Sequence, residues 1–137
     1  MKVLLLVFAL AASACSNGGV PTTAPSPGVL SGAWSGESAP NYTIVGNSLV
    51  TAFIGQRTDG LFAGTFEAHF ANPIHDYSGS VLGGVDGAQV TLTFTPSVAG
   101  HCPEQYLGTL TGSVITGTTL MFNCSPDQTG TFMLTKQ

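Results

Sequence analysis

Three histidines and a neighbouring aspartate are the residues of this chain whose types could do chemistry. His69, His75 and Asp76 lie close together in the sequence, and His101 and Glu104 follow later. Imidazole nitrogens and carboxylate oxygens bind zinc, but a site needs three or four of them converging at about 2 Å. Nothing in the spacing requires that convergence. His69, His75 and Asp76 are therefore weak metal candidates, and we expect no metal and no other cofactor.

Catalytic groups of other kinds are equally sparse. The chain has no serine in a Gly-x-Ser-x-Gly turn, and its few carboxylates are scattered, mostly in turn-like segments. Glu67 and His69, two residues apart, form the sole acid–imidazole pair expected on one strand face. A surface ion pair explains them more simply than catalysis does. We therefore expect a protein that is not an enzyme and keep a metal-dependent or hydrolytic enzyme as the least favoured alternative.

The segments that must position these residues alternate with a period of two, which is typical of strands with one buried face. In residues 62–70 the phenylalanines alternate with polar residues, so His69 is predicted to face solvent. In residues 90–95 Val90, Leu92 and Phe94 alternate with threonines. In residues 119–123 the same pattern predicts a core face at Leu120 and Phe122. No segment of ten or more residues keeps a helical period.

Turn signals divide the chain into strands. Asp59-Gly60 and Asp86-Gly87 are strong hairpin signals, while Thr116-Gly117, Gly46-Asn47 and Gln128-Thr129-Gly130 are weaker ones. Eight strands are expected, at approximately 31–37, 48–56, 60–70, 77–83, 88–95, 105–113, 118–124 and 130–136. We predict an all-β fold, a small eight-stranded antiparallel meander barrel, because closure removes the sheet edges that so few charges could protect.

Met1 to Cys15 resembles the leader of bacterial lipoproteins. Lys2 precedes the apolar run Val3 to Ala12, and Ala11-Ala12-Ser13-Ala14-Cys15 is similar to a lipobox, although Ala12 stands where Leu is commonest. The resemblance implies a signal peptide over 1–14 and lipidation of Cys15, including palmitate. An ordinary secretion signal in which Cys15 is incidental is the alternative. Ser16, rather than Asp, favours the outer membrane in a Gram-negative cell.

Two further expectations depend on that leader. Lipidation of Cys15 leaves Cys102 and Cys124 as one pair, and disulfide bonds persist outside the cytoplasm, so a Cys102–Cys124 bridge is predicted. Residues 16–28, SNGGVPTTAPSPG, are rich in Pro, Gly, Ser and Thr and predict a flexible linker. The expected organisation is thus a signal peptide over 1–14, a lipidated tether over 15–29 and a barrel domain over 30–137.

Charge limits the partners. Without Lys2, the chain keeps Arg57 and Lys136 against seven carboxylates, a net charge of −5. The absence of a basic patch excludes nucleic acid as an expected partner and leaves membrane contact to the acyl chains. The remaining expected partners are a protein or a small apolar ligand.

Several short motifs resemble calycins, the lipocalin and avidin-like barrels. Gly32-Ala33-Trp34 looks like their Gly-x-Trp opening, and Leu61–Glu67 and Gly130–Thr135 are similar to strands of avidin-like proteins. The resemblance implies a barrel with Trp34 packed across its closed end. Biotin binding does not carry over, because avidin-like sites use several further tryptophans and Trp34 is the only one here.

These observations predict a lipid-anchored cell-envelope protein that displays a non-catalytic β-barrel binding module. Small lipidated protease inhibitors of bacterial envelopes share the layout of barrel, disulfide and Gly-x-Trp start, so an envelope protease inhibitor is the alternative. No inhibitory segment can be mapped onto individual residues of this chain.

Overall fold

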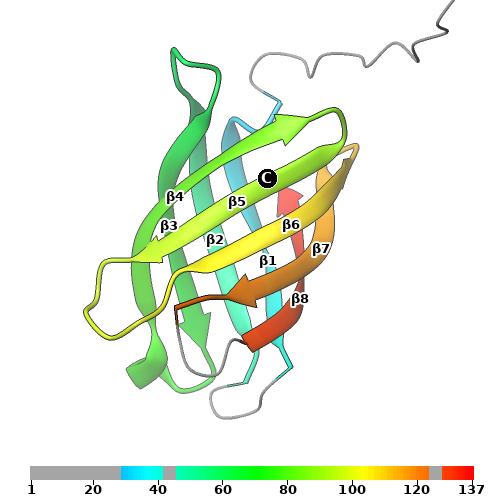
Figure 1. Cartoon of the computed structure of the whole chain (residues 1–137). Coiled ribbons are helices and arrows are strands. Elements are labelled where there is room, and N and C mark those ends of the chain that lie inside the picture. Colours follow the sequence, from blue (N-terminus) through cyan, green and yellow to red (C-terminus); the bar gives the residue numbers. More distant parts are fainter. Residues whose placement is uncertain (1–28, 42–45, 124–127) are drawn as a thin grey trace, which may run out of the picture.

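The computed structural model describes residues 29–41, 46–123 and 128–137. Eight strands and one short 3₁₀ helix succeed one another along these residues (Figure 1). They are β1 (Gly32–Pro40), β2 (Ser48–Gln56), β3 (Phe62–Phe70), η1 (Pro73–His75), β4 (Tyr77–Asp86), β5 (Gln89–Pro96), β6 (Glu104–Thr111), β7 (Val114–Met121) and β8 (Gln128–Lys136).

The strands form one closed antiparallel barrel. Each strand pairs with the next in sequence, and β8 returns to pair with β1, as in the register Gly36↔Leu134. The predicted eight-stranded meander barrel is confirmed. Closure gives each of these eight strands two neighbours, so none of them exposes a sheet edge.

Alternating side chains fill the barrel interior. Most predicted inward residues of β3 and β5 are at most 3% exposed: Phe62, Phe66, Ala68, Val90, Leu92 and Phe94. Phe70, at the end of β3, is partly buried against this core. Four aromatic rings, those of Phe66, Phe94, Tyr106 and Phe132, contact one another in sequence at centroid distances of 4.9, 4.4 and 4.6 Å. The rings extend across the interior from β3 to β8, so the core is packed with side chains.

The β2–β3, β4–β5 and β6–β7 turns lie at the barrel end where β1 begins (Figure 1). Trp34 is buried, as expected, and its indole Nε1 donates a hydrogen bond of 2.7 Å to the Leu30 carbonyl. Lys136 Nζ lies 5.8 Å from the Trp34 ring centroid. The chain entering β1 is thus fixed at this end of the barrel.

The seventh strand differs from the prediction. The hairpin turns at Gly112-Ser113, with Thr111 paired to Val114, so β7 runs from Val114 to Met121 instead of over 118–124. Gly112 has φ +61°, which suits a two-residue turn. Thr116-Gly117, the predicted turn, lies inside β7 and pairs with Thr109 and Gly108 of β6.

That shift also reverses the faces predicted for β7. Ile115 and Thr119 are the buried residues of this strand. Leu120, predicted to face the core, lies on the opposite face of the strand. Gly117 lies inside the strand opposite Gly108 of β6. A Cβ on Gly117 would lie 2.0 Å from the Leu107 carbonyl oxygen. Glycine is therefore needed here for close strand approach rather than for a turn.

Two other turn signals were displaced. The β4–β5 turn is made by Gly87-Ala88, because Asp86 still pairs with Gln89. The segment 128–130, predicted as a weak turn, begins β8. The Asp59-Gly60 turn is confirmed, with Gly60 at φ +84°.

Several predictions fall outside the described residues: the signal peptide, the lipidated Cys15, the tether as far as residue 28, and Cys124. Cys102 is described and lies just before β6. The Phe122 backbone N–H donates to the Pro103 carbonyl at 3.1 Å, which brings the segment approaching Cys124 next to Cys102. The bridge itself stays a prediction. In the described part of the chain, no helix has the length and apolar character to cross a membrane.

Candidate binding surface

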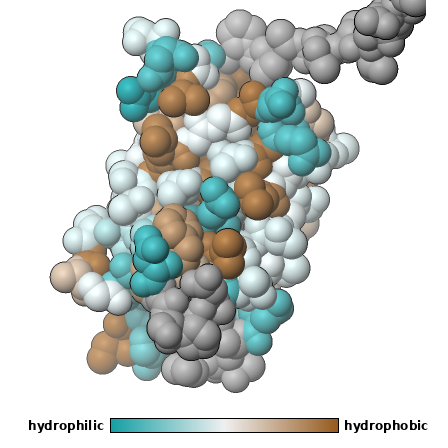
Figure 2. Space-filling model, viewed as in Figure 1, coloured by the Kyte–Doolittle hydropathy of each residue, from teal (hydrophilic) through white to brown (hydrophobic). Residues whose placement is uncertain are grey.

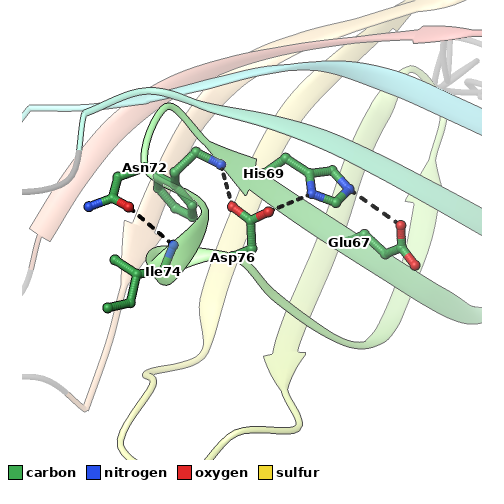
Figure 3. A network of polar contacts seen from close by, with 6 residues as sticks. Glu67, His69, Asn72, Ile74 and Asp76 are labelled. Carbon is green, nitrogen blue, oxygen red and sulfur yellow. Dashed lines mark hydrogen bonds and ion pairs between the residues drawn. The ribbon is translucent and has the colours of Figure 1, made fainter.

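A short line of carboxylate and imidazole groups lies on the outside of the barrel (Figure 3). His69 Nδ1 is 2.9 Å from Asp76 Oδ2, and His69 Nε2 is 3.4 Å from Glu67 Oε2. The other oxygen of Asp76 accepts a 2.8 Å hydrogen bond from the Phe70 backbone N–H. His69 is therefore held between two carboxylates.

The local sequence explains how Asp76 reaches His69. Asn72 Oδ1 accepts from the Ile74 N–H at 3.3 Å and caps η1, which begins with Pro73. The Asp76 N–H donates to the Pro73 carbonyl at 3.1 Å and ends the helical turn. This compact connection turns the chain back, so that Asp76 lies beside the end of β3.

The two titratable partners shift one another's pKa. The hydrogen bond to Asp76 is the main cause that raises the pKa of His69, and Glu67 adds to it. In return, the bond from His69 lowers the pKa of Asp76, and the Phe70 N–H lowers it further. The arrangement favours a cationic imidazole between two anions.

The other metal candidates do not join this group. The His75 ring faces Phe70 at a centroid distance of 6.4 Å, and the His101 ring faces Tyr77 at 5.0 Å. Within the ranges 29–41, 46–123 and 128–137, no three His, Cys, Asp or Glu side chains are arranged to hold a metal ion. The structure thus brings together His69 and Asp76 but places His75 and His101 elsewhere.

Glu104, the last member of the sequence cluster, lies inside the barrel. Its side chain is buried and hydrogen-bonds with Thr119 and Tyr106, and Ser38 bonds with Tyr106 in turn. Burial raises the pKa of Glu104, and burial together with the Glu104 charge raises that of Tyr106 well above its usual value. Sequence reasoning missed this cluster, although the two-residue spacing of Glu104 and Tyr106 already places them on one face.

The outer wall of β1, β2 and β3 has two shallow hollows. The first, of about 250 Å³, is lined by residues including Ala33, Phe53 and Glu67. The second, of about 360 Å³, is lined by residues including Leu49 and His69. Glu67 borders the first hollow and His69 borders the second, and these two side chains contact each other.

Two large apolar side chains of β2 project from this wall. Phe53 is 67% exposed and Leu49 is 52% exposed, although the strand also buries Val50, Ala52 and Ile54. The strand therefore carries apolar side chains on both of its faces. We therefore define the outer β1–β3 wall by Glu37, Leu49, Phe53, Glu67 and His69.

No protein-family model and no curated protein matches this chain.

Proposed function

We propose that this chain is a lipid-anchored cell-envelope protein whose barrel is a non-catalytic binding module. The observation that supports a binding module acting through its outer surface is the packed interior of the barrel. Because Phe66, Phe94, Tyr106 and Phe132 contact one another across the barrel, recognition is assigned to the outer surface rather than to an internal ligand cavity. Apolar interiors of small barrels are commonly filled in this way.

The geometry of His69 supports a binding role over a hydrolytic one. Nucleophilic catalysis by serine or cysteine needs an imidazole nitrogen aimed at the hydroxyl or thiol that it activates. Both ring nitrogens of His69 face carboxylates, those of Asp76 and Glu67. His69 therefore serves to hold charged groups together on the surface.

In this proposal, the lipoprotein-like segment Met1 to Cys15 provides the membrane anchor. Ala11-Ala12-Ser13-Ala14-Cys15 provides the lipidation site, and residues 16–28 provide the spacer between membrane and barrel. Two or more acyl chains give stable anchoring, whereas one gives only marginal binding. The protein would be held at the cell envelope, on the outer membrane in a Gram-negative host because Ser16 follows the cysteine.

Cell fractionation after expression in a bacterial host tests the anchor. We expect wild-type protein in the membrane fraction and mass spectrometry to find an acylated Cys15 at its N-terminus. Cys15→Ser should abolish acylation and leave the protein out of the membrane fraction, because it removes the thiol that carries the lipid. Ala12→Leu, which places the commonest residue in the motif, is the matched control and should remain anchored. Cys15→Ser protein that stays membrane-bound, or an unmodified Cys15 in wild type, contradicts the proposal.

A further inference from the structure

We propose that the outer β1–β3 wall binds a cationic amphipathic polypeptide segment, one in which Lys or Arg side chains accompany apolar ones. This inference rests on the proposed function, because it names the partner class of the binding module.

The apolar part of the surface comes from β2. Phe53 and Leu49 are four residues apart on the same strand face, and each lines one of the two hollows. Phe53 pairs with Ala33 on one side and with Thr65 on the other, so its ring stands above small neighbours. Two exposed apolar side chains beside two hollows suit a segment that presents apolar side chains at intervals.

Three carboxylates lie beside these apolar side chains and hollows. Glu37 pairs with Leu49 across β1 and β2, Glu67 borders the first hollow, and Asp76 contacts His69. The strands β1, β2 and β3 are described throughout and contain no Lys or Arg. Even with His69 protonated, the three carboxylates leave this wall with an excess of negative charge. A cationic partner is therefore complementary to it.

The two cations of the described chain lie at other positions. Arg57, in the β2–β3 turn, pairs with Asp59 at 2.9 Å. Lys136 donates to the Val29 carbonyl at 3.3 Å beside Trp34. A second copy of this chain would therefore bring carboxylates against carboxylates at the β1–β3 wall, which disfavours self-association through it.

The opposite side of the barrel provides an internal control. The strands β5, β6 and β7 have Glu104 as their only charged residue, and it is buried. Figure 2 shows this side, where pale residues predominate and brown side chains stand among them. Leu107 of β6 is 45% exposed there. Leu107 is thus exposed to about the same extent as Leu49, but β5, β6 and β7 place no exposed carboxylate around it.

Fluorescence anisotropy tests the proposal with the full chain carrying Cys15→Ser, which removes the acylation site and leaves every described residue unchanged. The probe is a labelled peptide of Lys and Leu, compared with a peptide in which Glu replaces each Lys and another in which Ser replaces each Leu. We expect only the Lys/Leu peptide to bind. Its affinity should fall as salt rises from about 20 to 200 mM, because exposed charges become screened.

Matched variants locate the site. Phe53→Ser and Leu49→Ser should each raise Kd by about fivefold or more, because each removes apolar contact area. Glu37→Gln and Glu67→Gln should each raise it about two- to threefold and reduce its salt dependence. Leu107→Ser and Asp86→Asn, both away from the wall, should leave Kd within about twofold of wild type. Circular dichroism verifies that every variant is folded.

Three results would overturn the inference: failure of the Lys/Leu peptide to bind, equal binding of the Glu/Leu peptide, or equal effects of Phe53→Ser and Leu107→Ser. Sedimentation velocity adds a fourth. A dimer that Phe53→Ser dissociates would identify a second copy of the chain as the occupant. Failure of anchoring is distinguishable from all of these, because the peptide assay uses unlipidated protein.

Discussion

At the scale of single residues, burial inside the barrel changes the pKa of Glu104. Glu104 is buried beside Thr119 and Tyr106, whose hydroxyl groups stabilise its carboxylate only in part, since burial still raises its pKa. A buried carboxyl whose pKa is raised binds its proton more tightly in the folded chain than in the unfolded one. Its ionisation therefore lowers stability as pH rises through the interval between those two pKa values.

We predict that Glu104→Gln raises the melting temperature at pH 7, because the amide retains hydrogen-bonding capacity without a buried charge. The gain should shrink as pH falls and vanish below the unfolded pKa of glutamate, where the carboxyl is neutral in both states. Thermal unfolding followed by circular dichroism at pH 4 to 8 measures this. A variant less stable than wild type at pH 7 would mean that the ionised carboxylate is stabilised by its partners. Asp86→Asn, at the exposed end of β4, is the control.

At the scale of elements, the β6–β7 hairpin depends on two facing glycines. Gly108 and Gly117 pair across these strands, and a Cβ on Gly117 would come within 2.5 Å of the Gly108 Cα. A Cβ on Gly108 would meet the Phe132 ring at 2.7 Å. The strands and the aromatic core thus occupy the space that side chains would need.

We expect Gly117→Ala to lower the free energy of unfolding by about 1–3 kcal/mol, because the added methyl group must displace backbone. Urea denaturation monitored by Trp34 fluorescence gives this value. Gly84→Ala in β4 is the matched control, since its nearest atom, Leu61 Cδ2, would be 3.7 Å away. Equal stability of the two variants would show that the hairpin can adjust to the extra methyl group.

At the scale of the whole molecule, the predicted Cys102–Cys124 bridge would join the start of β6 to the connection between β7 and β8. The hydrogen bond from Phe122 to Pro103 already holds these segments together. In the chain-entropy view, a bridge of this loop length contributes about 3–4 kcal/mol by restricting the unfolded chain. That contribution is large for a domain of about 110 residues.

Intact mass spectrometry of protein exported to an oxidising compartment checks the bridge. We expect the mass to increase by two hydrogen atoms on reduction, and peptide mapping to find Cys102 linked to Cys124. The double variant Cys102→Ser/Cys124→Ser should unfold at lower urea concentration, and reduction should no longer affect its stability. Unchanged mass on reduction contradicts the pairing.

Much of the fold could be predicted because strand alternation is a local property. Phe62 to Phe70 and Val90 to Phe94 show in sequence which residues face inward, since successive side chains point to opposite faces. The same rule placed His69 outside and beside Glu67. It failed at β7, where Gly117 looked like a turn residue and Leu120 like a core residue. Only the close approach of β6 reveals why a glycine is needed inside that strand.

By itself, therefore, the sequence determined the number of strands, their order as a meander and most of their faces. The tertiary structure decided what lies around each side chain. Residues 49–54 are apolar on both faces, and only closure shows that Phe53 and Leu49 face outward beside acidic groups. Likewise, Asp76 meets His69 because η1 turns the chain back. Periodicity records the direction of a side chain from its strand, whereas its neighbours depend on segments that are distant in sequence.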